Sequence, residues 1–253
     1  AILSDRHLWA QILMKNHGPV VPDLATIPGG ADFELSAGLK KYSQLFCKPR
    51  RGSAGRGCFV VERKETNSVP AVYKTRAGAV TQQSTWSCLM EAAALEDYLI
   101  QPFMTNHPVL AGLCETEDAI TVRIITEMQD SKTAGVYSMM LEIPAPPGKA
   151  VGAGTKEQTK NRFHVIIPIS RTTGEIGRFP GKKLPPSAMG YYEQVYEKMD
   201  GNPMPFWNEI KKSSLASQSL FPDLYAIAWD YVVTSSGPFL LEGNTGWGTR
   251  MPQ

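Results

Sequence analysis

The stretch that decides the fold is "AWDYVVTSSGPFLLEGN", residues 228–244. Two apolar runs flank a Ser-Ser-Gly turn signal centred near Ser236, and this pattern predicts a β-hairpin. Pairing the strands outward from Ser236 sets Asp230 opposite Glu242, and cross-strand neighbours have Cβ atoms about 5 Å apart. The pairing depends on the register, so we expect that a bulge in either strand would break it.

This hairpin brings three oxygen-bearing side chains to one face of the sheet. Asn244 lies two residues beyond Glu242 and therefore projects from the same face. Two facing carboxylates repel each other, so in an apolar setting either one is protonated or both share a cation. Two carboxylates and an amide oxygen suit Mg²⁺ or Mn²⁺ rather than zinc. The alternative is a solvated pair of carboxylates with a turn asparagine, which the surrounding apolar residues disfavour.

A second motif is the glycine-rich turn in "CKPRRGSAGRGCFVV", residues 47–61. Its glycines lie between two predicted strands and let backbone N–H groups approach an anion closely. Four basic residues surround them: Lys48, Arg50, Arg51 and Arg56. The motif is neither a Walker A loop nor a dinucleotide fingerprint. Alone it fits a basic hairpin loop at least as well, but beside a predicted Mg²⁺ site it indicates a flap over nucleotide phosphates.

The remaining patterns predict strands in the middle of the chain, flanked by helices. Ser4 is expected to cap a first helix whose apolar face carries Leu8, Trp9, Ile12 and Leu13. The proline in "LIQPFM" (99–104) argues against an interior strand there. Further helices are expected over 84–99, 191–199 and 206–221, and strands over 44–49, 58–63, 70–74, 119–128, 134–143 and 163–170. This order indicates an α+β fold rather than a regular βαβ alternation.

The composition is that of an ordinary globular protein, with 253 residues, 42% hydrophobic and 20% charged. A net charge of +2 is too balanced for a dedicated nucleic-acid binder. The four cysteines form no C-x-x-C pair and are expected to be reduced thiols of a cytoplasmic protein (Cys47, Cys58, Cys88 and Cys114). No apolar run approaches the ~18 residues of a membrane span. Asp5 and Arg6 interrupt the apolar core that a signal peptide needs. Whether the chain forms a homo-oligomer is left open.

In this order the motifs resemble the ATP-grasp superfamily, above all its sugar-transfer associated group and next its ribosomal-protein and peptide glutamate ligase branch. The stretch "SDRHLWAQILMKNHGPVVP" (4–22) resembles the family's first helix, and "FCKPRRGSAGRGCFVV" (46–61) resembles its phosphate flap. The stretch "LIQPF" (99–103) resembles the linker that holds adenine, and "ITVRIIT" (120–126) resembles the strand that carries an arginine near the transferred phosphate. The hairpin is the most specific match, because its Asp, Glu and Asn agree with the family in type and spacing.

The resemblance implies an α+β ATP-grasp fold, in which two α+β subdomains clasp ATP and the usual N-terminal α/β subdomain is reduced or absent. It divides the chain into three parts. An N-terminal helix and linker cover residues 1–43, a small phosphate-flap subdomain covers 44–104, and a catalytic subdomain with the metal site covers 105–253.

The resemblance also assigns roles to single residues. Lys48 and Arg123 would be the catalytic cations, and Mg²⁺ or Mn²⁺ would be held by Asp230, Glu242 and Asn244. ATP would be contacted by Arg6, Lys48, Ser53, Gly55, Gly57, Ile100, Gln101 and Phe103. Arg250 and Trp247 are candidates for substrate contacts, with a solvated arginine and a packing tryptophan as the alternatives.

The activity that the resemblance implies is a Mg-ATP-dependent carboxylate–amine ligase that forms an acyl phosphate and releases ADP. Its partners would be small-molecule or peptide-like carboxylate and amine substrates, one of them peptide- or sugar-linked. No separate general base is obvious, because His107 before Pro108 fits a turn-stabilising role better. The alternatives are an ATP-dependent phosphotransferase and a nucleotide-binding module without turnover. The intact Asp-Glu-Asn set disfavours the module.

Overall fold

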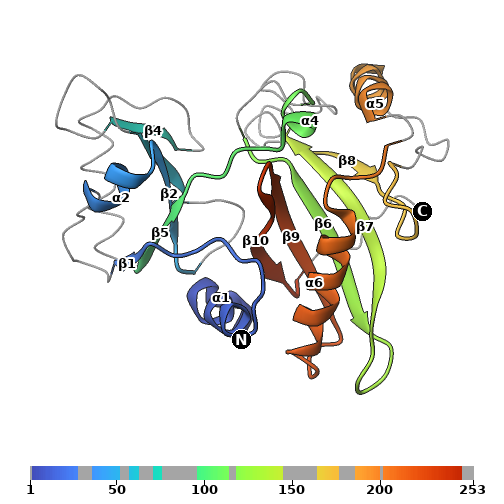
Figure 1. The fold of residues 1–253 in the computed structure, drawn as a ribbon, viewed down its shortest axis with the longest axis horizontal. Helices are drawn as coiled ribbons and strands as arrows, with labels where there is room; N and C mark the ends of the chain where they lie inside the picture. The colour runs from blue at the N-terminus through green and yellow to red at the C-terminus, as the bar shows by residue number, and fades with distance from the viewer. Residues whose placement is uncertain are drawn as a thin grey trace, which may run out of the picture. The chain divides into compact units, whose positions relative to one another are not determined.

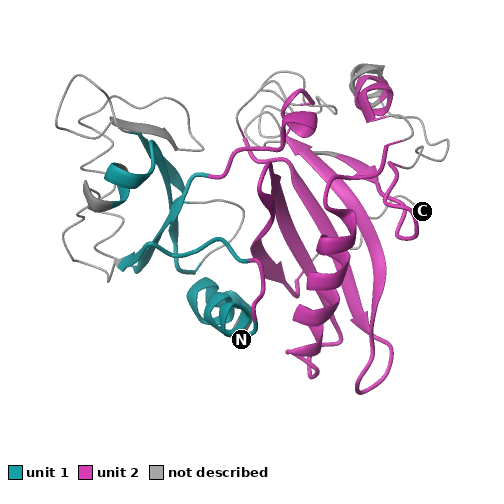
Figure 2. Cartoon of the chain, in the orientation of Figure 1, with its two compact units in different colours: residues 1–16, 20–103 teal, residues 17–19, 104–253 magenta. Residues whose placement is uncertain are grey.

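Two antiparallel sheets of five strands each form the framework of the described chain, with helices beside them, so the predicted α+β class is confirmed (Figure 1). The structure is a computed structural model that describes residues 2–27, 36–51, 57–62, 71–75, 96–113, 118–144, 164–176, 186–199 and 202–246. The chain divides into two compact units, residues 1–16 with 20–103 and residues 17–19 with 104–253 (Figure 2). Each unit contains one of the two sheets.

The first unit is built on five strands: β1 (Ala25–Ile27), β2 (Gln44–Pro49), β3 (Phe59–Glu62), β4 (Ala71–Thr75) and β5 (Tyr98–Pro102). Their order in the sheet is β1-β5-β2-β3-β4, and every neighbouring pair is antiparallel. The described helical segments of this unit are η1 (Ile2–Ser4), α1 (Arg6–Lys15) and α2 (Ser36–Lys41). Strand β2 has its predicted bounds, and its side chains Leu45 and Cys47 are fully buried.

Strand β5 lies inside this sheet, between β1 and β2, although it contains Pro102. The expectation that this proline argues against an interior strand is therefore wrong. β1 pairs with Tyr98–Ile100 and reaches no further, so no β1 residue needs the N–H that Pro102 lacks. The helix predicted over 84–99 is wrong at its end, because its last two residues belong to β5. Its residues before 96 lie outside the described part of the chain.

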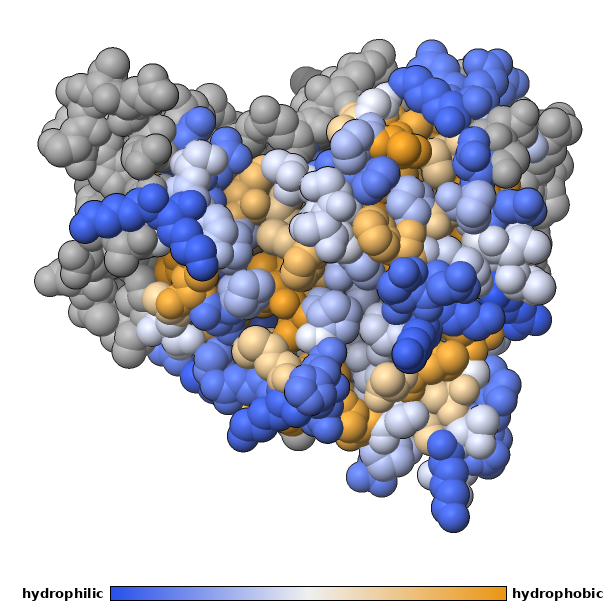
Figure 3. All heavy atoms as spheres, in the orientation of Figure 1, coloured by the Kyte–Doolittle hydropathy of each residue, from blue (hydrophilic) through white to orange (hydrophobic). Residues whose placement is uncertain are grey.

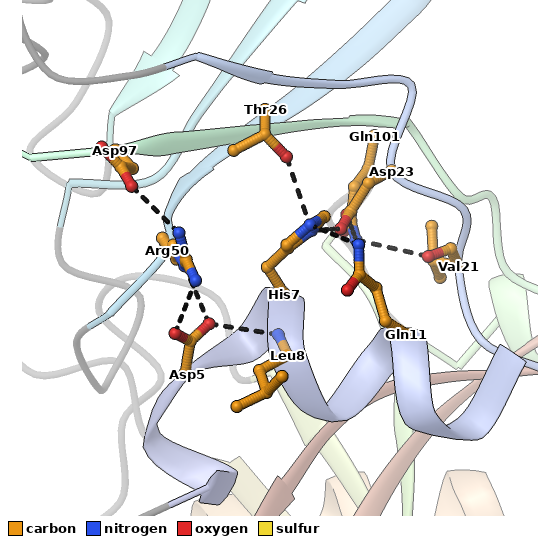
Figure 4. A network of polar contacts seen from close by, with 10 residues as sticks. All are labelled: Asp5, His7, Leu8, Gln11, Val21, Asp23, Thr26, Arg50, Asp97 and Gln101. Carbon is orange, nitrogen blue, oxygen red and sulfur yellow. Dashed lines mark hydrogen bonds and ion pairs between the residues drawn. The ribbon is translucent and has the colours of Figure 1, made fainter. Parts of the chain in front are cut away.

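Helix α1 begins at Arg6, one residue later than a cap at Ser4 would place it. Asp5, not Ser4, is the N-cap, and its carboxylate accepts a hydrogen bond from the Leu8 N–H at 3.1 Å. On the predicted apolar face Trp9 is buried, whereas Leu8 is 40% exposed. Asp5 is favoured because its carboxylate also accepts two hydrogen bonds from the Arg50 guanidinium, both at 2.8 Å (Figure 4).

Arg50 joins α1 to the start of β5. Its guanidinium donates to Asp97 Oδ2 at 3.1 Å, and its backbone N–H donates to the Asp97 carbonyl at 2.8 Å. A second network in Figure 4 joins α1 to the same sheet through Asp23, whose Oδ2 lies 2.8 Å from His7 Nδ1. The other carboxylate oxygen of Asp23 accepts from Gln101 Nε2 at 2.8 Å. Polar contacts thus fix the first helix to β2 and β5 at two places.

The cysteines of this unit behave as the sequence predicts within the described residues. Cys47 and Cys58 are free thiols, and burial raises the pKa of the Cys47 thiol well above its usual value. Cys47 is therefore a neutral thiol in the core at physiological pH. Cys88 and Cys114 lie outside the described residues.

The second unit is built on the strands β6 (Thr121–Met128), β7 (Ala134–Pro144), β8 (His164–Pro168), β9 (Ala226–Thr234) and β10 (Gly237–Asn244). Their order is β10-β9-β6-β7-β8, again antiparallel throughout. Its described helices are α4 (Pro108–Ala111), α5 (Pro186–Met199) and α6 (Trp207–Ser219). Helix α6 runs along the sheet and lies against β6, β7 and β9 (Figure 1).

The two faces of this sheet carry different side chains. On the face toward α6, Trp229 Nε1 donates to Thr126 Oγ1 at 2.8 Å, and that hydroxyl donates to Gln218 Oε1 of the helix at 2.9 Å. Arg123 and Asp230 pair directly across β6 and β9. Since successive residues of a strand alternate between faces, Asp230 and its partner project away from α6. The charged residues of the hairpin are thus separated from the packing under α6.

Hydrophilic and apolar residues are interspersed over the described part of the face in Figure 3. The large apolar side chains that are exposed are scattered along the sequence: Leu8, Met14, Leu24, Val109, Tyr137 and Tyr225. Among the helices that the structure describes, none has the length and apolar character needed to cross a membrane.

We predict that Asp5→Asn lowers the free energy of unfolding by about 1–2 kcal/mol at pH 7, because asparagine still caps α1 but loses the ion pair with Arg50. The Arg50 hydrogen bond lowers the pKa of Asp5. This stabilisation is therefore fully present above the unfolded-state pKa of about 3.9, and it is lost as the pH falls through the lower folded-state pKa. Denaturant unfolding between about pH 2 and 8 measures it. A deficit of Asp5→Asn that does not shrink in acid would contradict this explanation.

Candidate active site

The hairpin of β9 and β10 places Asp230 opposite Glu242, as predicted. However, the turn and the register differ from those predicted. Thr234 pairs with Gly237, so the turn consists of Ser235 and Ser236, and the regular register continues as far as Leu240. A bulge at residue 241 then shifts the register by one. Without this shift Asp230 would face residue 241, so the expectation that a bulge would break the pairing is wrong, because here a bulge produces it.

Gly243 sits between the two predicted metal ligands of β10 because of its own cross-strand neighbour. It pairs with Trp229, whose fully buried indole covers this position on the α6 side of the sheet. A Cβ on Gly243 would lie 2.7 Å from Trp229 Cζ3 and 2.9 Å from Cε3. Because Gly243 has no side chain, the Trp229 ring can pack over it. Glu242 and Asn244, its neighbours in the sequence, project from the opposite face.

Arg123 is the centre of the charged face. It donates to both carboxylate oxygens of Asp230, from Nε at 2.7 Å and from Nη2 at 2.8 Å. Its remaining nitrogen, Nη1, lies 2.8 Å from Glu142 Oε1. A predicted catalytic cation therefore stands between two buried carboxylates, one on β9 and one on β7.

Glu142 was missed by the sequence reasoning. It pairs with Thr121 on β6 and is only 5% exposed. Thr121 lies two residues from Arg123, so Glu142 and Arg123 project from the same face of the sheet. The available signal was one carboxylate inside the otherwise apolar run "MMLEI", residues 139–143. An isolated charge in such a run indicates a buried partner of opposite sign.

Asn244 joins the two carboxylates of the hairpin. Its Nδ2 donates to Glu242 Oε1 at 3.2 Å and to Asp230 Oδ2 at 3.3 Å. Rotation of this amide by about 180° would turn its oxygen toward the same point. Of the three side chains that the sequence predicts as metal ligands, Asn244 thus lies within hydrogen-bonding distance of both carboxylates.

The electrostatics of the site follow from this crowding. The pKa of Asp230 is raised to about 7, mainly by burial; the hydrogen bonds and the charge of Arg123 oppose this rise, and the nearby Glu242 and Glu142 carboxylates add to it. Burial works against the charge of Arg123, but its bonds to Asp230 and the charge of Glu142 outweigh this effect and raise the pKa of the guanidinium. Arg123 is therefore charged at every physiological pH. A further cation close to Asp230 would lower the pKa of that carboxyl.

The donor set fits Mg²⁺ or Mn²⁺ in kind. Asp230, Glu242 and Asn244 offer oxygen atoms, which these ions prefer, and no sulfur or imidazole stands among them. Within the described residues, no three His, Cys, Asp or Glu side chains form a group that could hold a metal ion. The predicted ligand set therefore combines two carboxylates with the amide of Asn244.

In the first unit, two predicted ATP contacts, Lys48 and Arg6, lie at β2. Lys48 pairs with Leu99 of β5 and is buried. Arg6 is buried as well, and its Nη1 donates to the carbonyl of Pro49, the residue after Lys48, at 2.8 Å. Arg6 thus contacts the strand that carries the predicted phosphate lysine.

Gly57 ends the glycine-rich turn in a conformation that favours glycine, with φ at 71°. A Cβ there would lie 2.9 Å from Pro49 Cγ, and the Gly57 carbonyl accepts from the Tyr98 hydroxyl at 3.2 Å. Two other predicted members of the flap, Ser53 and Gly55, lie outside the described residues.

The predicted adenine linker is engaged in the sheet. The Gln101 side chain is buried and donates to Asp23, as Figure 4 shows. The Ile100 carbonyl accepts from Leu24 N at 2.7 Å, and the Phe103 N–H donates to the Gln44 carbonyl at 3.2 Å. These contacts hold the linker in place and use the Gln101 amide within the protein.

Three further residues were considered for roles at the site: His107, Trp247 and Arg250. His107 is the N-cap of α4 and accepts from the Val109 N–H at 3.3 Å, which confirms its turn-stabilising role. Trp247 and Arg250, the predicted substrate contacts, lie outside the described residues.

We predict that Gly243→Ala lowers the free energy of unfolding by about 1–3 kcal/mol, because the new methyl group would overlap the buried Trp229 ring. The matched control is Gly246→Ala, where an added Cβ meets nothing within 4 Å. We expect the control to change stability by less than about 0.5 kcal/mol. Urea unfolding of both variants decides the point, and equal effects would show that the contact with Trp229 does not limit residue 243.

Comparisons with known proteins agree with the fold. The structure of D-alanine–D-alanine ligase from Bacillus anthracis is similar with a TM-score of 0.54 at 13% identity, covering 96% of this chain and 57% of that one. A biotin carboxylase–β,γ-ATP complex from Campylobacter jejuni is similar with a TM-score of 0.54 at 11% identity, covering 98% of this chain and 42% of that one. The chain thus spans about half the length of these two proteins.

A comparison with curated proteins finds no match. The family described as sugar-transfer associated ATP-grasp, in contrast, matches residues 1–253, which is the whole sequence. The predicted family is thereby confirmed, and the chain belongs to the sugar-transfer associated ATP-grasp family.

Proposed function

We propose that the protein is a Mg-ATP-dependent carboxylate–amine ligase that releases ADP. The observation that carries this proposal is the charged face of the second sheet. There Asp230, Glu242 and Asn244 converge beside the guanidinium of Arg123. An oxygen-ligand set next to a fixed cation is what the transfer of a γ-phosphoryl group requires.

Each group has a distinct task in this proposal. Arg123 offsets the negative charge that develops on the transferred phosphoryl group, and Lys48 neutralises the phosphates of ATP. Asp230, Glu242 and Asn244 would hold Mg²⁺ or Mn²⁺. When bound, the ion neutralises charge on the β- and γ-phosphate oxygens. Arg6, which donates to the carbonyl after Lys48, supports the strand that presents this lysine.

The reaction has two steps. A carboxylate oxygen of the acid attacks the γ-phosphorus, the bond from this phosphorus to the β,γ-bridging oxygen breaks, and ADP leaves. The amine nitrogen then attacks the carbonyl carbon of the acyl phosphate, phosphate leaves, and the amine proton passes to solvent. Arg123 is the group of this chain that can stabilise charge in both steps, because each one builds negative charge on phosphate oxygens.

Family membership and fold likeness support the proposal. The name of one similar protein states that it ligates D-alanine, and the other was solved as a complex with an ATP compound. We propose by analogy small-molecule or peptide-like carboxylate and amine substrates, with a peptide- or sugar-linked acceptor in view of the family description. The balanced charge and reduced thiols are in keeping with a cytoplasmic enzyme.

The residues are tested by the double variant Glu242→Gln with Asn244→Ala. We predict that ADP formation falls by on the order of a hundredfold or more, while thermal unfolding stays within a few degrees of wild type. The matched control is Glu127→Gln, which removes one carboxylate from the far end of β6, where Glu127 accepts a hydrogen bond from Tyr225 at 3.4 Å. Wild-type turnover by the double variant would refute the metal assignment.

The reaction class is tested by product analysis with Mg-ATP and panels of acids and amines, followed by phosphorus NMR. A ligase yields ADP, phosphate and an amide. ADP with a phosphorylated acceptor would show a phosphotransferase instead, and nucleotide binding without ADP would show a module. AMP with pyrophosphate would contradict the proposed chemistry altogether.

A further inference from the structure

Glu142 has no task in the proposed reaction, yet it is a buried carboxylate bonded to the proposed catalytic arginine. It lies on β7, and the proposed ligands Asp230 and Glu242 lie on β9 and β10, on the other side of β6. Two strand spacings of about 4.8 Å separate its backbone from that of Asp230. Glu142 therefore stands apart from the ligand set, and it contacts Arg123 of the site.

A bound cation and Arg123 would use the same carboxylate. Both oxygens of Asp230 accept from the guanidinium, and one of them also accepts from Asn244, which marks the point where the ligand atoms converge. A divalent ion at that point would repel the guanidinium and weaken its hold on Asp230. Arg123 would then leave the site unless another group retained it.

We infer that Glu142 is a positioning residue that retains Arg123 at the site when Asp230 turns to a cation. Arg123 is held from two sides, at 2.7–2.8 Å by Asp230 on β9 and at 2.8 Å by Glu142 on β7. Loosening of the first pair would leave the second intact, and the two nitrogens that now bind Asp230 would become able to donate to the transferred phosphate. The inference rests on the proposed metal-dependent function. It explains how Arg123 stays at the site both with and without a bound cation.

The negative charge of Glu142 also affects how strongly Arg123 binds Asp230. If Glu142 were neutral, Arg123 would keep its hydrogen bonds to Asp230 and the attraction of Glu242, and the pair with Asp230 would tighten. A cation would then have to overcome a stronger bond to reach Asp230. Glu142 should therefore raise cation affinity through Arg123 and not by touching the cation itself.

The experiment is a double-mutant cycle on Glu142 and Arg123, with Mn²⁺ alone as the probe and free Mn²⁺ measured by electron paramagnetic resonance. We expect Glu142→Gln, which preserves size and a hydrogen-bond acceptor, to weaken Mn²⁺ binding about tenfold. In the Arg123→Gln background the same change should weaken it less than about twofold. The matched charge control, Glu127→Gln, should leave Mn²⁺ affinity at the wild-type value.

Two outcomes would overturn the inference. Unchanged Mn²⁺ affinity in Glu142→Gln would show that the glutamate has only a structural role. Equal losses with and without Arg123 would show that it acts on the cation directly. Failure of the proposed function looks different, because then the wild type would not bind Mn²⁺, or Asp230→Asn would bind it as well as the wild type.

A second measurement keeps the inference testable if Glu142→Gln does not fold. The Nε signal of Arg123 can be followed by nitrogen NMR in the wild type and assigned by its loss in Arg123→Gln. We expect Mg²⁺ to shift this signal, because Arg123 loses its hydrogen bonds to Asp230. The signal should stay sharp, because the ion pair with Glu142 still holds the side chain in place. An unshifted signal, or one broadened as in a freely moving arginine, would overturn the inference.

Discussion

The pair between Arg123 and Asp230 is the interaction on which the charged face depends. It joins β6 to β9 in the middle of a sheet, with both carboxylate oxygens engaged and Asp230 almost fully buried. The guanidinium lies between the carboxylates of Asp230 and Glu142, and the charge of the nearby Glu242 also acts on it. This grouping of negative charge, with Asp230 and Glu142 buried, favours either protonation of Asp230 or an additional cation, and the proposed Mg²⁺ would supply that cation.

The strands can carry these charges because the sheet assigns its faces to different tasks. Trp229, Thr126 and Gln218 form a buried polar and aromatic layer beneath α6, and the alternation of β9 turns Asp230 the other way. The bulge at residue 241 and the missing side chain at Gly243 then adapt β10 to both faces at once. Core packing and the candidate chemistry are thus set by the same few residues of one hairpin.

Local signals were enough to predict much of this architecture. The bounds of β2 and the presence of the terminal hairpin follow from alternation and a short turn, which depend on few neighbours, whereas the facing of Asp230 and Glu242 also needs a bulge at residue 241 that the sequence pattern does not show. Tertiary contacts decided the rest. Ser4 and Asp5 are both good caps, and Asp5 is the cap because Arg50, 45 residues away, pairs with it. Glu142 was not foreseen because its partner Arg123 lies on another strand, whose register no local pattern shows.

The central claim is that Asp230, Glu242 and Asn244 form a cation site that shares Asp230 with Arg123. A crystal structure of the protein grown with ADP and Mn²⁺, with anomalous data collected at the manganese edge, tests it most directly. The account predicts an anomalous peak about 2.1–2.2 Å from oxygen atoms of all three side chains, with Arg123 still bonded to Glu142. A manganese ion bound elsewhere, or an Asp230 carboxylate whose two oxygens both remain on Arg123, would contradict it.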